Sequence, residues 1–319
     1  KAILDSGENF MSGEQLSKKL GISRTAVWKH INALREEGYN IESVNKKGYR
    51  LAEKPDDILS SENIAYNLPT EFIGKKVIHL DTVGSTNDYA KEIGNKVSGG
   101  TLIISEQQTK GKGRLGRVWK SKSGDGIWMS LIIKPKIEPY KAPFLTLVAG
   151  ASVVKALSNL GVEVSIKWPN DIIVHNKKIC GILTELSAEM ERVNYVVIGI
   201  GINIKTIDFP DEIKEKATSL YKEGYKLSRV DIVRQFCIEF EKLYKGYILD
   251  GNKQDTLELC RKYSAIIGKQ VYVIKNNKRE LVKCIDINEN GNLIVKEKNG
   301  EIQEIMSGEV SIRGVKGYV

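Results

Sequence analysis

The first fifty residues have the apolar spacing of two short helices. Ser12, with Gln15 three residues later, forms the pattern of an N-terminal capping box and predicts a helix over residues 13–20. Ser23 is placed to cap a second helix, which we expect to run over residues 24–37. Two such helices, joined by a short turn that contains glycine, predict a helix-turn-helix.

The second helix separates its apolar and polar positions onto two faces. The apolar face is expected to hold Ala26, Val27, Ile31, Ala33 and Leu34. The polar face carries donors for phosphate groups and base edges, so we expect DNA contacts from Arg24, Thr25, Trp28, Lys29, Asn32 and Arg35.

A hairpin is expected directly after the helices. Residues 41–44 and 49–51 form two extended segments, joined by a turn that holds Lys46, Lys47 and a glycine. A helix-turn-helix followed by a basic hairpin predicts a winged helix-turn-helix DNA-binding domain over residues 1–60, with both lysines among its DNA contacts. The alternative is a small helical interaction domain whose basic face is only solvated.

After a linker at residues 52–62, short apolar runs alternate with capped helical segments. Strands are expected at residues 77–80, 101–105, 127–133, 164–166, 172–174, 179–186 and 195–200, and helices at residues 87–93, 145–160 and 230–247. This pattern predicts a mixed α/β domain with one large sheet over residues 61–266. Beyond Gly268, alternating runs at residues 270–274, 281–287 and 293–296 predict a small β-barrel over residues 267–319. Two excess positive charges there leave nucleic-acid binding by the barrel as a competing interpretation.

Composition narrows the class of protein. The chain has 319 residues, a net charge of +9 and 41% hydrophobic residues, which suits a globular protein with an anionic partner. Its four cysteines are scattered and its three histidines lack metal-ligand spacing, so we expect neither a disulfide framework nor a protein metal site. No apolar run reaches about 18 residues and no signal-peptide pattern is present, so we expect a cytoplasmic protein without membrane contact.

A glycine-rich loop at residues 111–119 is the most prominent local motif. It contains Gly-x-Gly-x-x-Gly, but no strand precedes it directly and no helix follows, as a dinucleotide-binding fold would require. The other protein-kinase motifs are missing from the chain. Residues 107–124 carry six Lys or Arg and no acid, so the loop is either a solvated basic segment or an anion site.

Three further motif segments follow this loop. Residues 167–171 read Lys-Trp-Pro-Asn-Asp, residues 178–183 follow with Lys-Ile-Cys-Gly-Ile-Leu, and residues 198–203 read Ile-Gly-Ile-Gly-Ile-Asn. In this order they resemble the biotin protein ligase family, as do residues 81–87 and 307–313. With the winged helix in front, the chain is similar to the bifunctional ligase–repressor branch. The resemblance implies an α+β fold, with a class II synthetase-like central domain and an SH3-like C-terminal barrel.

The resemblance also implies the chemistry. Biotin and ATP would form biotinyl-5′-AMP and pyrophosphate, with Mg²⁺ accompanying ATP, and a lysine of a biotin carboxyl carrier protein would then take the biotin. The adenylate would act as corepressor, so that a homodimer formed on adenylate binding would bind the operator DNA of biotin genes. Charge neutralisation by fixed cations suits such a reaction, and no Ser-His-Asp or Cys-His arrangement is visible.

The family pattern assigns site residues. The catalytic residues would be Lys178, near the biotin carboxylate and the α-phosphate, and Arg114, which would hold the adenylate. Biotin would contact Ser85, Thr86, Asn87, Gln108, Gly111, Lys112, Gly113, Arg114, Lys178 and Gly181. The nucleotide would contact Arg117, Trp119, Asn170, Asp171 and Asn203. Lys112 stands where an arginine is expected, so the charge is kept but the bidentate fork is lost. Residues 206–224 resemble the loop that covers adenosine, with Tyr221 and Tyr225 as candidates for its aromatic lid.

Other interpretations stay open. Trp119, Trp128 and Trp168 could each be ordinary core residues, and the glycines at residues 199 and 201 could mark close strand packing. A regulator that senses biotin with an inactive ligase site, and a ligase for lipoate or another acyl group, are the alternatives from other functional classes.

Overall fold

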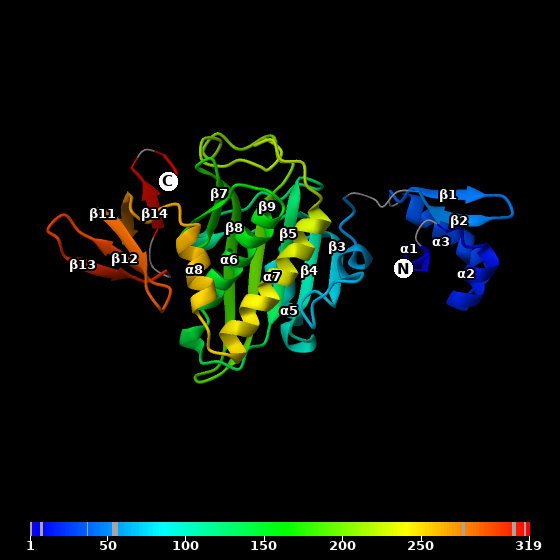
Figure 1. Cartoon of the computed structure of the whole chain (residues 1–319), viewed down its shortest axis with the longest axis horizontal. Helices are drawn as coiled ribbons and strands as arrows, with labels where there is room; N and C mark the ends of the chain where they lie inside the picture. The colour runs from blue at the N-terminus through cyan, green and yellow to red at the C-terminus, as the bar shows by residue number, and fades with distance from the viewer. Residues whose placement is uncertain are drawn as a thin grey trace.

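The computed structural model describes residues 2–6, 9–36, 38–52, 57–275, 278–307, 311–315 and 317–319. Figure 1 shows the chain as three consecutive units, with a small helical unit at one end, a large sheet covered by helices in the middle and a small β unit at the other end. This arrangement confirms the predicted order of a helix-turn-helix, a mixed-sheet domain and a C-terminal β domain.

The N-terminal unit begins with the predicted helix pair and hairpin. Its elements are α1 (Ala2–Asp5), α2 (Gly13–Leu20), α3 (Arg24–Glu36), β1 (Ile41–Val44) and β2 (Gly48–Leu51). The capping box is present, because Ser12 Oγ accepts from the Gln15 backbone N–H at 3.1 Å and Gln15 Oε1 accepts from the Ser12 backbone N–H at 2.8 Å. Ser23 Oγ accepts from the Ala26 backbone N–H at 3.1 Å, which confirms its capping role.

A small core holds this unit together. Its fully buried members are Leu16, Val27, Ile31, Tyr39 and Ile41. The prediction that Ala33 belongs to the apolar face was wrong, because its side chain is exposed. The neighbouring Ile31 and Leu34 face the core instead. The hairpin needs glycine at Gly48, where φ is +106° and a Cβ would lie 2.1 Å from the Met11 carbonyl oxygen.

The predicted linker is shorter than expected at its C-terminal end. Residues 53–56 lie outside the described residues. Leu59 is buried in the core of the central unit, and Ser60 caps helix α4 (Ser61–Ala65) by accepting from the Asn63 backbone N–H at 3.1 Å. The central unit therefore begins before residue 61.

The central unit is built on one seven-stranded mixed sheet. Its strand order is β3–β4–β5–β9–β8–β7–β6, in which β3 and β4 are parallel and all other neighbours are antiparallel. The strands are β3 (Val77–Val83), β4 (Thr101–Gln108), β5 (Gly126–Ile133), β6 (Ser165–Lys167), β7 (Asp171–Val174), β8 (Lys177–Ala188) and β9 (Val193–Asn203). Every predicted strand of this domain is confirmed, although most extend further than the apolar run that indicated them.

Helices cover both faces of this sheet. Ile103 packs beneath α5 (Thr86–Ile93), whereas its neighbours Leu102 and Ile104 belong to the larger cluster with α6 (Phe144–Asn159) and α7 (Arg229–Leu249). Successive strand residues point to opposite faces, so α5 lies opposite α6 and α7. Figure 1 shows α6 and α7 side by side on one face. Helix α8 (Gln254–Lys262), which the sequence pattern did not predict, follows them.

Helix α6 is the most apolar helix of the described chain. Within the described residues, only Pro139–Asn159 is long and apolar enough to cross a membrane, and 72% of its most apolar window is buried inside the protein. Core helices of globular proteins commonly have this composition.

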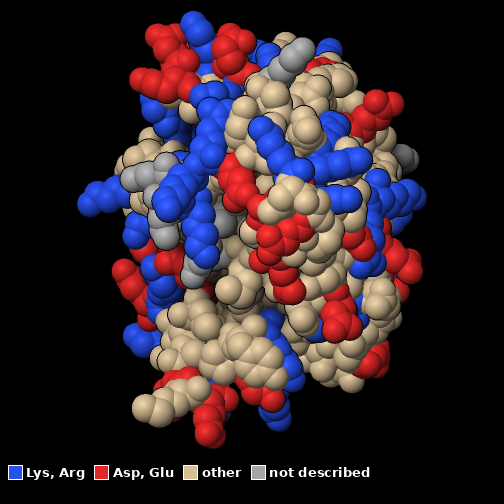
Figure 2. Space-filling model, turned by 90° about the vertical axis from the view of Figure 1, so that its left-hand side faces the viewer, with Lys and Arg blue, Asp and Glu red and all other residues tan. Residues whose placement is uncertain are grey.

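The C-terminal unit is a five-stranded antiparallel sheet with the order β13–β12–β11–β10–β14. Its strands are β10 (Gln270–Lys275), β11 (Lys278–Ile287), β12 (Leu293–Lys296), β13 (Ile302–Ile305) and β14 (Ser311–Gly314). Arg261 of α8 pairs with Asp286 at 2.8 Å, and Trp168 Nε1 donates to the Gly291 carbonyl at 3.0 Å, so the unit packs firmly on the central one. Figure 2 shows Lys and Arg mixed with Asp and Glu over this end, which does not favour the competing interpretation of a nucleic-acid-binding barrel.

Candidate active site

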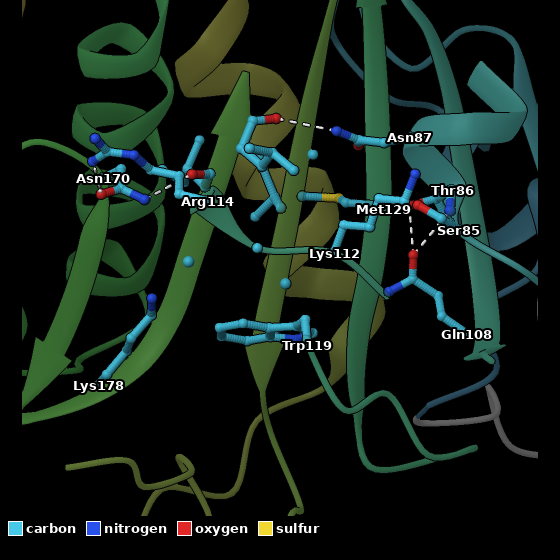
Figure 3. Close-up of a pocket in the computed structure, with 17 residues that line it drawn as sticks. Ser85, Thr86, Asn87, Gln108, Lys112, Arg114, Trp119, Met129, Asn170 and Lys178 are labelled. Atoms are coloured by element: carbon cyan, nitrogen blue, oxygen red, sulfur yellow. Dashed lines mark hydrogen bonds between the residues drawn. The ribbon is translucent and has the colours of Figure 1, made fainter. Parts of the chain in front are cut away.

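Two adjoining hollows lie beside the middle strands of the central sheet. The narrow hollow has about 450 Å³ of empty space and is lined by Ser85, Thr86, Asn87, Gln108, Lys112, Gly113, Arg114, Trp119, Met129, Asn170, Lys178, Gly181, Ile182, Leu183, Gly199, Ile200 and Gly201. These include nine of the ten residues predicted to bind biotin, and only Gly111 lies off the lining. Figure 3 shows Arg114 and Asn170 on one side, Thr86 and Gln108 on the opposite side, and Trp119 between them.

One end of the narrow hollow is a hydrogen-bonded polar cluster. Gln108 Oε1 accepts from the backbone N–H and the hydroxyl of Thr86, at 2.9 and 3.1 Å, while Gln108 Nε2 donates to Ser121 Oγ at 2.8 Å. Ser85 precedes α5 but its buried side chain makes no capping hydrogen bond. The hydroxyl of Ser85 therefore remains available to a ligand in the hollow, in a cluster whose other members hold one another in place.

Asn87 lies at the same polar end of the narrow hollow. Its Oδ1 accepts from Ser130 Oγ at 2.6 Å and its Nδ2 donates to Glu185 at 2.7 Å. A Cβ at Gly199 would lie only 2.2 Å from Asn87 Oδ1, so this strand position requires glycine. Asn87 was predicted to contact biotin; in the structure it lines the hollow, and both atoms of its side-chain amide already make hydrogen bonds.

The glycine loop folds back on itself through close backbone contacts. The Trp119 backbone N–H donates to the Gly111 carbonyl at 2.9 Å, and a Cβ at Gly111 would lie 2.3 Å from the Trp119 carbonyl oxygen. Gly111 is therefore required for the shape of the loop, although it does not line the hollow. At the loop's tip, Leu115 and Val118 are 69% and 77% exposed.

Two of the three cations of this loop, Lys112 and Arg114, have different surroundings. Lys112 pairs with Asp88 at 2.7 Å, so a carboxylate of α5 already compensates its charge. Arg114 crosses the hollow and donates to Asn170 Oδ1 at 2.9 Å and to the Ser307 carbonyl at 2.6 Å. Burial lowers the pKa of the Arg114 guanidinium, and the nearby Asp171 carboxylate opposes that effect.

Trp119 forms the floor that the two hollows share. A Cβ at Gly201 would lie 2.6 Å from Trp119 Nε1, and one at Gly181 would lie 2.9 Å from the indole ring, so both glycines make room for this side chain. Trp119 Nε1 is buried and has no hydrogen-bond partner among the described residues. A buried donor without a partner at the edge of a hollow indicates a place for a ligand acceptor. Trp119 is therefore a site residue, and Trp128 is a buried core residue on neither lining. Trp168 is also buried but contributes to the lining of the wide hollow.

Lys178 stands where the hollows meet. Its ammonium pairs with Asp171 and lies 5.1 Å from the centre of the Trp119 ring. Burial would raise the pKa of the Asp171 carboxyl, but the charge and hydrogen bond of Lys178 outweigh burial and hold that pKa below its usual value. Asp171 is therefore a carboxylate whose charge fixes the position of Lys178.

The wide hollow adjoins the narrow one at Gly113, Arg114, Trp119, Asn170 and Lys178. It is larger, and its lining includes all five residues predicted to bind the nucleotide: Arg117, Trp119, Asn170, Asp171 and Asn203. Asn203 Nδ2 donates to the Thr218 carbonyl at 3.1 Å, which ties the strand end to the segment of residues 206–224. That segment has no strand, as expected.

Several lining residues of the wide hollow were not predicted as site residues, among them Lys167, Phe209, Arg313 and Tyr318. Phe209 is the aromatic residue that the 206–224 segment contributes to this lining, whereas the predicted candidates Tyr221 and Tyr225 do not line it. Tyr225 instead accepts from the Glu163 backbone N–H at 3.3 Å. Lys167 lies within the Lys-Trp-Pro-Asn-Asp motif, so its position beside Asn170 was the signal that could have identified it.

Cations on the lining of the wide hollow outnumber the acids. The cations are Arg114, Arg117, Lys120, Lys167, Lys178, Lys216 and Arg313, and the acids are Asp171, Asp208 and Glu212. Such a surface suits a polyanion. Within the described residues, no group of three or more His, Cys, Asp and Glu side chains could hold a metal ion.

A second candidate surface lies on the N-terminal unit. Arg24, Thr25, Trp28, Lys29, Lys46 and Lys47 are exposed on α3 and the hairpin turn, while Asn32 is half-buried. Arg35 donates to the Ile41 carbonyl at 2.7 Å and lies within hydrogen-bonding distance of Ser43 Oγ, so it also fixes the hairpin against the helix. Arg24 pairs with Glu14 at 2.8 Å.

Comparisons with known proteins agree with this architecture. A model of the biotin/lipoate A/B protein ligase family matches residues 80–203, an HTH domain model matches residues 1–50, and a model of the biotin protein ligase C-terminal domain matches residues 266–313. Bifunctional ligase/repressor BirA of Bacillus subtilis (strain 168) is 43% identical, over 96% of this chain and 95% of its own length. Bifunctional ligase/repressor BirA of Escherichia coli (strain K12) is 32% identical, over 99% of this chain and 96% of its own.

A solved structure, biotin protein ligase from Aquifex aeolicus in complex with biotin and ATP, is similar to the larger part of the chain. Its TM-score is 0.66 and its sequence identity 32%, and the match covers 75% of this chain and 99% of that one.

Proposed function

The chain belongs to the bifunctional ligase/repressor BirA family, and from that premise we propose that it activates biotin with ATP, transfers biotin to an acceptor protein and represses biotin genes. The observation that carries this proposal is the junction of the two hollows, where Arg114 and Lys178 line both. A carboxylate in the narrow hollow and a nucleotide in the wide hollow would meet between these two cations.

Biotin fits the character of the narrow hollow. Its walls include Met129, Ile182 and Ile200, and its polar end holds Ser85 and Gln108. An apolar cavity with a few fixed polar groups suits a small ligand that must be bound in one orientation. In this placement the head of biotin lies at the polar end and its carboxylate points toward Lys178.

The first reaction step needs charge compensation more than a protein nucleophile. A biotin carboxylate oxygen attacks the α-phosphorus of ATP, the bond to the bridging oxygen breaks, and pyrophosphate leaves with the electron pair. The products are biotinyl-5′-AMP and pyrophosphate. Lys178, held by Asp171, supplies a fixed positive charge where the two anions approach each other.

The second step transfers the biotinyl group. A neutral lysine amine of the acceptor, a biotin carboxyl carrier protein, attacks the anhydride carbonyl, AMP leaves, and the amine loses a proton as the amide forms. Arg114, anchored by Asn170 and the Ser307 carbonyl, holds the adenylate until the acceptor arrives. Lys112 contributes a charge that Asp88 already compensates, so we assign it the smaller share in holding this intermediate.

The wide hollow is the proposed nucleotide site. Arg117, Asn170, Asp171 and Asn203 line it, and Phe209 is positioned in the loop that would cover the base. Mg²⁺ commonly binds through substrate phosphates and few protein groups. This agrees with the described residues, among which no group of three or more His, Cys, Asp and Glu side chains could hold a metal ion. We therefore expect Mg²⁺ to arrive with ATP and assign no protein ligands to it.

Repression would use the winged helix. A single recognition helix offers a short contact surface, so tight operator binding needs two copies on two half-sites. We propose that the adenylate orders the glycine loop, whose exposed Leu115 and Val118 make it a candidate for the dimer surface. We place the domain boundaries near residues 60 and 266. We place the protein in the cytoplasm, where ATP, the acceptor protein and the operator DNA are available.

Exchange of labelled pyrophosphate into ATP tests the proposal against its two alternatives. The purified chain should exchange pyrophosphate when biotin is added and not when lipoate is added. Exchange with lipoate alone would indicate a lipoate ligase. Biotin-dependent DNA binding without any exchange would indicate a regulator with an inactive ligase site.

A further inference from the structure

Tyr318 reaches from the end of the C-terminal unit back into the wide hollow. It follows β14, is 8% exposed, and lines the hollow together with Lys167 and Asp171. The turn that directs it there is tight, because a Cβ at Gly314 would lie 2.3 Å from the backbone of Val319. The side chain therefore has a defined place at the proposed nucleotide site, 147 positions along the chain from Asp171.

Two groups of the hollow depend on this side chain and its backbone. The Tyr318 hydroxyl donates to one oxygen of the Asp171 carboxylate, whose other oxygen pairs with Lys178. The Lys167 ammonium donates to the Tyr318 carbonyl at 2.6 Å and lies 3.3 Å from the centre of the Tyr318 ring. One residue thus contacts a carboxylate and a cation that both face the hollow.

We propose that Tyr318 is a positioning residue for adenylation, which holds Asp171 in its ion pair with Lys178 and covers Lys167 against water. This inference rests on the proposed function. In this role, the end of the C-terminal unit helps to set the geometry of the nucleotide site. Tyr318 need not contact the reacting atoms.

The hydroxyl and the ring have separable effects. With only the hydroxyl removed, Asp171 loses one of the two donors that fix its plane, so its hold on Lys178 loosens. With the ring removed as well, water reaches Lys167. Burial is the main cause that lowers the pKa of Lys167, to about 7. The negative charge of Asp171 opposes this lowering, and the positive charges of Arg313, Lys178 and Arg117 lower the pKa further.

This difference gives a pH signature. In the wild type, Lys167 loses its charge as pH rises through about 7, so a contribution of that charge to ATP binding fades between about pH 6 and 8. Exposure raises the pKa of Lys167 toward its ordinary value, so the charge persists across this window in the ring-deleted variant. Tyr318→Ala should therefore show a flatter pH dependence of the KM for ATP, whereas Tyr318→Phe should keep the wild-type slope.

The test compares Tyr318→Phe and Tyr318→Ala with a control, Tyr272→Phe, in the same unit. Tyr272 lies on β10 with its ring against Arg279, and it belongs to the lining of neither hollow. Loss of a hydrogen bond to a charged group should raise the KM for ATP by about tenfold in Tyr318→Phe. The KM for biotin should stay within about twofold, and Tyr272→Phe should match the wild type.

The outcomes are distinguishable from failure of the proposed function. A wild-type chain without biotin-dependent pyrophosphate exchange would contradict the proposed function itself. An active wild type, together with an unchanged KM for ATP in a folded Tyr318→Phe variant, would overturn the role of Tyr318 alone. Equal losses for ATP and biotin, with a lowered unfolding temperature, would show a merely structural role and overturn it as well.

Discussion

Arg114 donates a hydrogen bond of 2.9 Å to the side-chain oxygen of Asn170 and so joins the glycine loop to the segment that enters β7. The two residues are 56 positions apart, and each belongs to a different motif of the sequence. Asn170 Nδ2 also donates to the Ile182 carbonyl at 2.9 Å, so the Asn170 amide links the loop to strand β8. Arg114 and Asn170 line both hollows, so their contact lies where the narrow and wide hollows adjoin.

Loss of this anchor should release the intermediate. We expect Arg114→Gly to form biotinyl-AMP but to hold it loosely, because glycine keeps the backbone of the loop and deletes its clamp. The escaped adenylate should then label lysines of any protein nearby. Incubation with biotin, ATP and serum albumin, followed by a streptavidin blot, measures this labelling.

The matched control for that variant is Lys110→Gly, an exposed cation just before the loop that lines neither hollow. It should leave the albumin unlabelled. An unlabelled albumin in the Arg114→Gly reaction, despite rapid adenylate synthesis, would contradict the holding role of Arg114.

The floor of the site should tolerate no side chain at Gly201. A methyl group there would meet Trp119 Nε1 at 2.6 Å, so Gly201→Ala should displace the indole and raise the KM for both biotin and ATP by about tenfold or more. Gly150→Ala is the control, because its Cβ would meet only Ile182 Cδ1, at 3.8 Å, and it lies inside helix α6.

In Gly150→Ala, kinetics should be unchanged and the free energy of unfolding should rise by about 0.5–1 kcal/mol from the helix preference of alanine. Steady-state kinetics and thermal unfolding of both variants provide the comparison. Normal KM values in Gly201→Ala would show that the position of Trp119 does not matter to either substrate.

DNA binding should be coupled to the loaded ligase site and separable from its chemistry. Operator protection upstream of biotin genes should increase when biotin and ATP are both present, in parallel with self-association measured by sedimentation. Deletion of residues 1–52 should abolish protection and leave pyrophosphate exchange largely intact. The deletion ends before Asp57, because this carboxylate accepts from the Arg229 backbone N–H at 2.8 Å and belongs to the central unit.

A variant of the hairpin turn supplies the control for DNA contacts. Lys46 and Lys47 are exposed there, and replacing both with alanine should weaken DNA binding at all sequences and reduce its salt dependence, without an effect on exchange. Equal operator affinity of the empty and loaded protein would contradict the coupling and leave the winged helix as an independent module.

Strongly periodic segments were predicted well from the sequence, and locally weak ones were not. The capping box at Ser12 and the buried strands of the central sheet have clear local patterns. Helix α8 and strands β13 and β14 are short and rich in polar residues, and they were not predicted. Segments of this length depend mainly on tertiary packing for their stability.

The same limit applies to the site. Family motifs identified Ser85, Gln108 and Lys178, because these residues lie within recognisable segments. Tyr318 reaches the wide hollow through tertiary contacts from a segment without such a motif. Phe209 lies in the recognised segment of residues 206–224, but at a position that the resemblance did not single out. Asn87 and Arg35 were predicted as ligand-contacting residues, but each also makes structural hydrogen bonds. These bonds depend on neighbours that only the folded chain brings close.

The proposed role of Lys178 in adenylation is tested most directly by the rate at which Lys178→Met forms biotinyl-AMP in a single turnover. Lys178 is the cation at the junction of the two hollows, and a fixed electrostatic donor of this kind typically contributes about 10²–10³ in rate. Lys177→Met, at the adjacent strand position outside both linings, is the control. We predict a loss of about 10²–10³ for Lys178→Met and a wild-type rate for Lys177→Met. Adenylate formation at the wild-type rate by folded Lys178→Met would contradict the account.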